Sequence, residues 1–329
     1  MDTIDSVAAP LRVFRLDPMD STPFADDGRL AELNLEIVDS IDKAECIVTR
    51  RKHYLTRDVV RPGRIHLLWT HEPFFDTTPS FFEFLHFERY GRDCPLYVFN
   101  AHSGLIYTDN YYYGPIGRPL PLIKGEQDLN VDFSDKLITF VASFKKFDAQ
   151  VDGSSISLYA TRQNLALELH GRGDLRLIGR GWPEGVSEGE SRYAQGALDA
   201  KHAFIAQSNF SLAYENCISD YYVTEKIWQS IQGGCLPIYF ANETIHQTFP
   251  FDSFIDGAPF KTSEELANFI KAMPLQEYIR RVNVCREVYN YALSRRFRAI
   301  SRRHAGLRLK RFLDSVCASS LRAVDKASA

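Results

Sequence analysis

A cluster of polar residues between positions 209 and 239 is the part of this chain best suited to chemistry. The segment reads NFSLAYENCISDYYVTEKIWQSIQGGCLPIY. Its pattern predicts a strand, a loop, a helix and a second strand. Polar side chains gather where the first strand ends and where the helix starts: Glu215, Asn216, Tyr222, Glu225 and Lys226.

The start of that helix, predicted over residues 222–231, suits a phosphate group. The first N–H groups of a helix are free, and the helix dipole is positive at this end. Lys226 would add a full charge, Glu225 can accept hydrogen bonds from ribose hydroxyls, and Asn216 can donate to a phosphate or sugar oxygen. Each also has a structural interpretation, such as a solvated helical face or, for Tyr222, a core position. Their combination predicts a site for a nucleotide-activated sugar.

Short apolar runs alternate with longer helical stretches along the whole chain, a rhythm typical of parallel α/β architecture. The run Leu137–Ser143 is nearly continuously apolar, as expected of a strand covered on both faces. We predict further strands at residues 11–16, 46–49, 65–70, 96–100, 175–178, 210–214 and 236–240. We predict helices around residues 162–170, 194–206, 222–231, 263–273 and 276–292.

The stretch Tyr113–Val131 holds three prolines and several glycines without clear periodicity, which marks a domain boundary. We therefore expect an N-terminal Rossmann-like domain at 1–125 on the acceptor side, a C-terminal Rossmann-like domain at 132–292 that binds the nucleotide sugar, and a tail at 293–329. Ligands of such sheets bind beyond the carboxyl ends of the strands.

Three motifs together resemble the bacterial type of the α-1,3-fucosyltransferases of glycosyltransferase family ten. They are Tyr214-Glu215-Asn216, then Tyr222-Val223-Thr224-Glu225-Lys226-Ile227-Trp228, then Gly234-Cys235-Leu236-Pro237-Ile238. The family signature is a strand ending in Phe-Glu-Asn, followed by Tyr-Val-Thr-Glu-Lys and Gly-x-x-Pro. The resemblance covers about Leu137 to Phe254, and the N-terminal third matches only faintly.

The resemblance implies a GT-B fold, in which two Rossmann-like domains face a cleft and the C-terminal one holds GDP-fucose. By position, Arg162, Asn216, Tyr222, Glu225 and Lys226 would contact the donor. Arg162 falls where the family places an arginine on the diphosphate, and a guanidinium can hold phosphate oxygens bidentately. The alternative for Arg162 is an exposed position on an amphipathic helix. Residues 177–181 (LIGRG) resemble the family's strand that turns tightly near the nucleotide.

Two departures from the family pattern stand out. Tyr214 replaces the usual Phe, and its added hydroxyl needs a partner. The residues after the second strand read Tyr239-Phe240-Ala241-Asn242, where the family commonly has a glycine. We expect a reshaped loop there.

The resemblance also implies a general base from the N-terminal domain. The predicted strand Ile65–Thr70 ends in His71-Glu72-Pro73, which resembles the family strand that ends in a base glutamate. We therefore assign the base to Glu72. His71 is the rival, since its intrinsic pKa suits proton transfer. A surface-loop carboxylate is the structural alternative for Glu72.

The sequence predicts that activity requires neither a metal ion nor a bound cofactor. No Asp-x-Asp pair follows a strand, so positive side chains and the helix dipole would neutralise the leaving diphosphate. We expect no metal site and no essential divalent ion, with GDP-fucose as a co-substrate. The six cysteines are widely spaced and form no CxxC pair, which favours reduced thiols in a cytosol-like compartment.

Charge is unevenly distributed. The chain carries a net charge of −3, but residues 291–329 alone carry +8. An acidic body argues against a nucleic-acid partner. The segment 293–316 has eight Lys/Arg between Arg295 and Arg311 and apolar residues at roughly helical spacing, which predicts a basic amphipathic helix. It would either contact an anionic membrane surface or pack its apolar face on the protein. We expect a cytoplasmic enzyme, with a peripheral position at the inner face of the membrane if the first alternative holds.

The resemblance thus implies an inverting fucosyltransferase that acts on an N-acetylglucosamine- or glucose-containing glycan, with an α-1,3-type linkage, for instance in lipopolysaccharide or capsule assembly. Alternatives are the same fold with a different nucleotide sugar or acceptor, and a non-catalytic protein that binds sugar nucleotides or glycans. Tyr107–Tyr113 either line the acceptor groove or are exposed turn aromatics.

Overall fold

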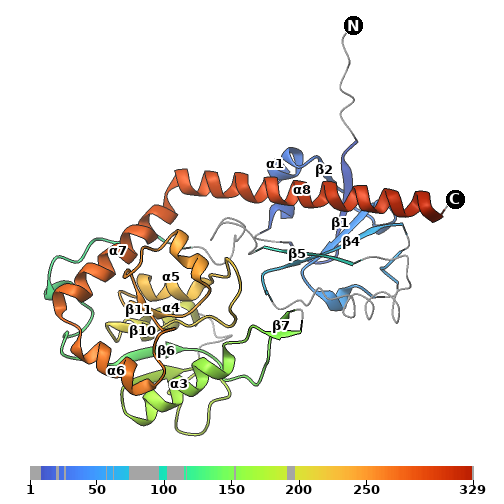
Figure 1. The fold of residues 1–329 in the computed structure, drawn as a ribbon. Helices are drawn as coiled ribbons and strands as arrows, with labels where there is room; N and C mark the ends of the chain where they lie inside the picture. The colour runs from blue at the N-terminus through green and yellow to red at the C-terminus, as the bar shows by residue number, and fades with distance from the viewer. Residues whose placement is uncertain are drawn as a thin grey trace.

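The computed structural model describes residues 9–19, 22–25, 27–56, 58–61, 63–73, 96–101, 115, 117–151, 153–190 and 197–327. Within these residues the chain forms two parallel five-stranded sheets with helices around them, and one long helix that spans both halves (Figure 1). The predicted mixed α/β architecture with two parallel sheets is confirmed. The predicted acceptor-groove aromatics at 107–113 lie outside the described residues.

The N-terminal sheet has the strand order β2-β1-β3-β4-β5. Its strands are β1 (Leu11–Arg15), β2 (Leu35–Ile37), β3 (Cys46–Thr49), β4 (Ile65–Thr70) and β5 (Leu96–Asn100). Every residue of β3 and β4 is buried, as expected of central strands covered on both faces. Short helices connect the strands: η1 (Pro23–Ala25), α1 (Asp27–Glu32), η2 (Ile41–Lys43) and η3 (Lys52–Tyr54).

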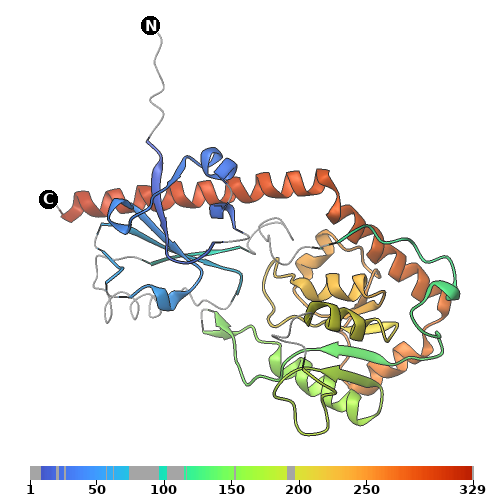
Figure 2. The same cartoon turned by 180° about the vertical axis from the view of Figure 1, so that it is seen from behind.

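The C-terminal sheet has the order β12-β11-β10-β6-β9. Its strands are β6 (Ile138–Val141), β9 (Leu175–Ile178), β10 (Phe210–Leu212), β11 (Leu236–Tyr239) and β12 (Ile255–Asp256). The helices of this half are α3 (Tyr159–Gly171), α4 (Ala197–Ile205), α5 (Glu225–Gln232), α6 (Ser263–Ala272) and α7 (Leu275–Leu293), with short turns η5 (Glu126–Asp128) and η6 (Glu243–Gln247). A small hairpin, β7 (Gln150–Val151) and β8 (Ser154–Ser155), extends from this half towards the other one (Figures 1 and 2).

Several helix bounds differ from the prediction, and the start of α5 is the difference that matters for the polar cluster. The helix expected from residue 222 begins at Glu225, because Tyr222 to Thr224 belong to a turn before it. Thr224 is the N-cap in an extended conformation, yet its hydroxyl makes no capping bond. That hydroxyl is held by the Glu215 carboxylate instead, so a tertiary contact overrides the local pattern.

The segment 117–131, predicted as the boundary, is fixed to α7. Leu120 N–H donates to Asn290 Oδ1 at 2.7 Å, and Ile123 N–H donates to Asn283 Oδ1 at 2.7 Å. Both asparagine amides donate back to the carbonyls of the same residues. Ile123 is also part of the C-terminal core. The segment therefore packs as an integral part of the C-terminal half.

The last helix, α8 (Arg295–Ala327), leaves the C-terminal half after α7 and runs along the N-terminal half (Figures 1 and 2). Leu309, Leu313 and Val316 are buried in the N-terminal core, which also contains Trp69 and Phe99. Of the two alternatives for the tail, the structure therefore shows the apolar face packed on the protein. Among the described residues, no helix is both long and apolar enough to cross a membrane.

Candidate functional site

A buried carboxylate organises the carboxyl end of the C-terminal sheet. Glu215 follows β10 and is fully buried. Its carboxylate accepts hydrogen bonds from the Thr224 N–H at 2.7 Å and the Thr224 hydroxyl at 2.8 Å, from the Tyr239 hydroxyl at 2.8 Å, and from Lys226 Nζ at 2.9 Å. Because it binds both the turn and the second strand, Glu215 fixes the entry into α5. The sequence grouped Glu215 with the polar site, but its contacts are those of an internal support.

Lys226 is a cation whose charge is already partly balanced. Its side chain is 14% exposed, and Nζ lies 2.9 Å from Glu215 Oε2 and 2.7 Å from the Thr224 hydroxyl. Burial disfavours the ammonium, but the Glu215 and Glu225 carboxylates outweigh this effect and raise the pKa of Lys226. The side chain therefore stays charged at the start of α5.

Glu225, the first residue of α5, is more open than its neighbours. Its side chain is 32% exposed, and Oε1 lies 3.8 Å from Lys226 Nζ. Burial raises the pKa of this carboxyl, but Lys226 and Lys201 lower it by more, so that the net pKa lies below the ordinary value. An ionised and accessible carboxylate in this position can accept hydrogen bonds from a ligand.

A chain of three hydrogen bonds joins four predicted site residues. Arg162 Nη1 donates to Asn216 Oδ1 at 2.6 Å, Asn216 Nδ2 donates to the Tyr222 hydroxyl at 3.5 Å, and that hydroxyl donates to Glu72 Oε2 at 3.3 Å. This series of hydrogen bonds begins on α3, passes the loop after β10 and ends at Glu72, the second residue after β4. The structure therefore brings residues from both sheets together at one place.

Arg162 is buried rather than exposed on a helix surface. It is 3% exposed, and its guanidinium carbon lies 4.5 Å from the centre of the Tyr159 ring. Within the described part of the chain its Nε atom has no hydrogen-bond partner. Burial lowers the pKa of this guanidinium. A buried donor without an acceptor is costly, and a guanidinium can hold phosphate oxygens bidentately, so Arg162 is suited to binding an anion.

Glu72 and His71 sit in different surroundings, although they are neighbours. Burial raises the pKa of the Glu72 carboxyl above its ordinary value, while Lys226 and the Tyr222 hydroxyl partly counteract this effect. Burial lowers the pKa of His71 to about 4. The His71 Nε2 atom accepts a hydrogen bond from the Trp69 indole N–H at 3.4 Å. Of the two base candidates, Glu72 is therefore the one in contact with the donor-side residues.

The ends of β9 and β6 approach each other at two glycines. Gly179 has a φ of +148°, and a Cβ atom there would lie 2.0 Å from the Ala142 carbonyl oxygen. Gly181 has a φ of +77°, and a Cβ atom there would lie 2.8 Å from the Phe144 carbonyl oxygen. The Phe144 N–H donates to the Arg180 carbonyl between them at 2.7 Å. The tight turn expected at residues 177–181 is present, and it keeps the backbone beside the site compact.

The two departures from the family pattern have local explanations. The Tyr214 hydroxyl donates to the Gly257 carbonyl at 3.2 Å, which gives it the partner that burial requires. Tyr239 places its hydroxyl on Glu215. In the following loop, Asn242 Oδ1 caps η6, and the Thr244 hydroxyl accepts from the Tyr221 N–H at 2.9 Å. The need for a partner of the Tyr214 hydroxyl was predicted, but Gly257 could not be named from the sequence, because the contact joins residues 43 positions apart.

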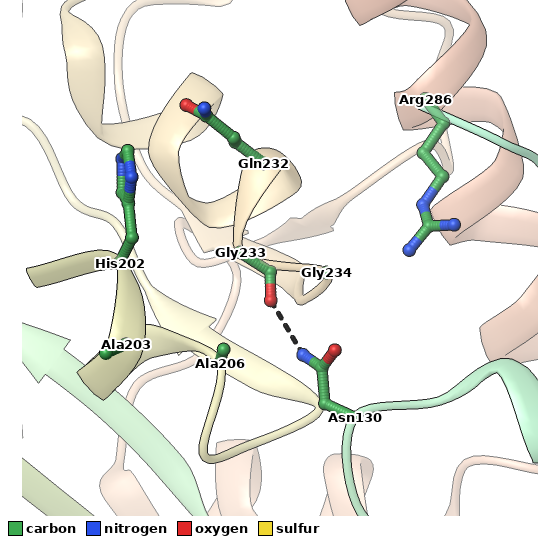
Figure 3. Close-up of a pocket in the computed structure, with 8 residues that line it drawn as sticks. All are labelled: Asn130, His202, Ala203, Ala206, Gln232, Gly233, Gly234 and Arg286. Carbon is green, nitrogen blue, oxygen red and sulfur yellow. Dashed lines mark hydrogen bonds between the residues drawn. The ribbon is translucent and has the colours of Figure 1, made fainter. Parts of the chain in front are cut away.

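A separate cavity of about 440 Å³ lies in the C-terminal half, at the opposite end of the strands from Glu215 (Figure 3). It is lined by Asn130, His202, Ala203, Ala206, Gln232, Gly233, Gly234 and Arg286. The Asn130 side-chain amide closes one wall by donating to the Gly233 carbonyl at 2.6 Å. Because Gly234 precedes β11, this cavity faces the amino ends of the strands. Ligands of such sheets bind beyond the carboxyl ends of the strands, where Glu215 and Asn216 lie.

Comparison with known families agrees with this geometry. Residues 153–282 match the model described as glycosyltransferase family 10 (fucosyltransferase), C-terminal part. This part of the chain is therefore similar to that family. The matched range includes Arg162, Asn216, Tyr222, Glu225 and Lys226 and excludes Glu72. The family 10 resemblance is thus confirmed, whereas the roles of the individual residues stay predictions.

Several curated proteins are similar to parts of the chain. A GDP-fucose protein O-fucosyltransferase 3 of Mus musculus is 30% identical over 178 residues, which are 54% of this chain and 35% of that protein. An alpha-(1,4)-fucosyltransferase of Arabidopsis thaliana is 34% identical over 94 residues, which are 28% of this chain and 22% of that protein. The chain thus spans about a third or less of the length of these relatives.

Solved structures resemble the chain over a larger share of its length. A crystal structure of an alpha1,3-fucosyltransferase with GDP has a TM-score of 0.45 and 16% sequence identity, and the match covers 86% of this chain and 84% of that one. A crystal structure of an alpha1,3-fucosyltransferase with GDP-fucose has a TM-score of 0.43 and 17% sequence identity, and the match covers 86% of this chain and 84% of that one.

Proposed function

We propose that this chain is an inverting fucosyltransferase that moves L-fucose from GDP-fucose to a hydroxyl group of a glycan acceptor containing N-acetylglucosamine or glucose, with an α-1,3-type linkage. The observation that carries the proposal is the hydrogen-bond chain from Arg162 to Glu72, which joins the region similar to family 10 to a carboxylate of the other sheet. A protein that only binds sugar nucleotides needs no such carboxylate.

In the proposed reaction each predicted site residue has its own task. Arg162 and Lys226 would hold the diphosphate, Glu225 the ribose or fucose hydroxyls, and Asn216 a phosphate or sugar oxygen. Glu72 would take the proton from the acceptor hydroxyl, whose oxygen then bonds to the anomeric carbon of fucose. The bond from that carbon to the diphosphate breaks, and GDP leaves with the electron pair. Inversion follows because the base and the leaving group stand on opposite sides of the sugar.

Two fixed cations support transfer without an essential metal ion. Arg162 and Lys226 are both largely buried, where a charge acts strongly on a leaving diphosphate. We expect turnover to persist after treatment with a chelator. Complete loss of activity that only a divalent ion restores would contradict this part of the proposal.

A second acceptor class has support from the comparisons. Several relatives are named GDP-fucose protein O-fucosyltransferase 3, so the acceptor hydroxyl is either that of a glycan or that of a protein side chain. We favour the glycan. Parallel assays with radiolabelled GDP-fucose would compare N-acetylglucosamine and glucose oligosaccharides with folded polypeptide acceptors. Label only in polypeptide would replace the glycan by a protein acceptor and leave the donor unchanged.

The donor is tested by a thermal-shift screen of nucleotide sugars. GDP and GDP-fucose should raise the melting temperature, since a ligand that binds only the folded state stabilises it. UDP-sugars and GDP-mannose serve as controls for the base and the sugar. A shift with UDP-sugars alone would refute the proposed donor. Binding of GDP-fucose without transfer to any acceptor, equally in wild type and Glu72→Gln, would favour the non-catalytic alternative.

A cytoplasmic enzyme with a peripheral membrane contact remains part of the proposal. Arg303, Lys310 and Arg311 are exposed on α8, away from the buried apolar residues of that helix. Such a basic face attracts anionic lipid. We expect the double variant Arg303→Glu and Arg311→Glu to lose sedimentation with phosphatidylglycerol vesicles. Lys124→Glu with Lys261→Glu, an equal charge change at exposed positions off α8, should not. Equal binding by both variants would refute the tail contact.

A further inference from the structure

Tyr222 occupies the middle of the series of hydrogen bonds, and its hydroxyl bonds a residue on each side of it. It accepts from Asn216 Nδ2 at 3.5 Å and donates to Glu72 Oε2 at 3.3 Å. The residue is 1% exposed, so solvent does not replace either contact. Asn216 is itself held by Arg162 Nη1 at 2.6 Å. The orientation of the Tyr222 hydroxyl is therefore set from the donor side.

The backbone around Tyr222 is held in one conformation. Tyr221 has a φ of +60°, which a residue with a side chain rarely adopts. The Tyr221 N–H donates to the Thr244 hydroxyl at 2.9 Å, and the Thr224 N–H after the turn donates to Glu215 at 2.7 Å. Such backbone strain persists only where surrounding contacts fix it. The turn thus presents the Tyr222 hydroxyl at a defined point of the interface between the two halves.

We propose that Tyr222 is a positioning residue that holds the Glu72 carboxylate across the interface and couples its orientation to occupancy of the donor site. This role differs from the donor contact that the motif implies. A diphosphate on Arg162 would pull on the guanidinium that holds Asn216, and Asn216 would pass the change to the hydroxyl. The base would then be aligned for the acceptor when the donor is bound.

The inference rests on the proposed function, and the first test separates positioning from donor contact. Tyr222→Phe removes one oxygen atom and keeps the ring. We expect kcat to fall about 10- to 100-fold, which is less than the roughly 100- to 10,000-fold that acid–base catalysis contributes, because Glu72 itself is retained. The KM for GDP-fucose should change little. Because the variant loses a hydrogen bond to the charged form of Glu72, the acidic limb of the kcat profile should move to higher pH.

Tyr214→Phe is the matched control. It also removes a buried tyrosine hydroxyl of the same half, but that hydroxyl binds the Gly257 carbonyl and not the site. We expect its pH profile to match the wild type. A rise in KM for GDP-fucose in Tyr222→Phe, with the acidic limb unmoved, would return Tyr222 to a donor contact and overturn the inference. Inactivity of the wild type with every acceptor would instead overturn the proposed function.

A second measurement does not need turnover. The titration of Glu72 can be followed by carbon NMR of protein labelled at the glutamate side-chain carboxyl, and Glu72→Gln identifies its signal. In Tyr222→Phe the midpoint should move to higher pH, and in Tyr214→Phe it should not. GDP should shift the Glu72 signal in wild type but not in Tyr222→Phe. An unmoved midpoint in Tyr222→Phe that still binds GDP, or an equal response to GDP in both, would refute the coupling.

Discussion

At the scale of the residue, burial shifts the pKa values of two neighbouring residues, Glu72 and His71, in opposite directions. Burial keeps Glu72 protonated to a higher pH than an ordinary glutamate, and it keeps His71 uncharged down to about pH 4. A general base works best when its pKa approaches the working pH. Burial moves Glu72 towards that range and moves His71 away from it. The contact with Tyr222 then places Glu72, and not His71, at the interface.

The pH dependence of turnover follows from this environment. Below the raised pKa, Glu72 carries a proton and cannot accept another, so kcat/KM should fall as the pH drops through a value above that of a free glutamate. Glu72→Gln should lower kcat about 100- to 10,000-fold and leave GDP binding intact. His71→Gln should keep most of the turnover and the same acidic limb. Full activity of Glu72→Gln would disprove the assignment of the base.

At the scale of the element, the bounds of several strands could be predicted from the sequence. The tertiary contacts that decide where other elements begin could not. The strands at 46–49, 65–70, 96–100 and 175–178 have the predicted bounds, because each is a short run made mostly of apolar residues. The helix α5 starts later than predicted, because the N–H and hydroxyl groups of Thr224 donate hydrogen bonds to the Glu215 carboxylate. The short strands β2 and β12 were missed, since two or three residues carry no periodicity.

Candidate site residues could be named because the motif sits at a strand end and a helix start. Their arrangement could not be predicted, because it depends on contacts between residues far apart in the chain. Glu72 lies 3.3 Å from the hydroxyl of a residue 150 positions away. The burial of Arg162 and the partnering of Lys226 by Glu215 depend in the same way on the assembled sheet.

The glycine turn after β9 gives a test at this scale. Gly179→Ala would place a methyl group against the Ala142 carbonyl, whereas Gly173→Ala shares a positive φ of +76° but meets no atom within 4 Å. Gly173→Ala should cost about 1 kcal/mol of unfolding free energy for backbone strain alone. Gly179→Ala should cost about 2–4 kcal/mol, because overpacking adds to the strain. Urea denaturation measures both, and equal losses would show that the close approach carries no energy.

At the scale of the whole molecule, the packing of α8 was the feature least predictable from the sequence. Its apolar spacing was recognised, but the surface that the apolar face covers could not be read from the chain. Leu309, Leu313 and Val316 belong to the N-terminal core, and the Phe312 ring lies 5.2 Å from that of Phe99. The Arg308 Nη2 atom donates to the Asn100 carbonyl at the end of β5 at 3.3 Å. The two halves are therefore joined at α8 as well as at Tyr222.

Packing of α8 predicts unequal effects of two leucines on one helix. Leu313 is 4% exposed and Leu307 is 48% exposed. Leu313→Ala should lower the unfolding free energy by about 2–5 kcal/mol, as large-to-small core substitutions do. Leu307→Ala should change it by less than about 0.5 kcal/mol. If Leu313→Ala is as stable as Leu307→Ala, the helix does not complete the N-terminal core.

This use of α8 has a consequence for biosynthesis. Trp69 and Leu309 share a core, yet the ribosome makes the leucine about 240 residues after the tryptophan. At about 5–20 residues per second, roughly 10–50 s pass between the two. During that interval the first-made half exposes apolar surface to the surrounding solution. The nascent chain is therefore a natural client for a chaperone that shields such surface until synthesis has passed residue 316.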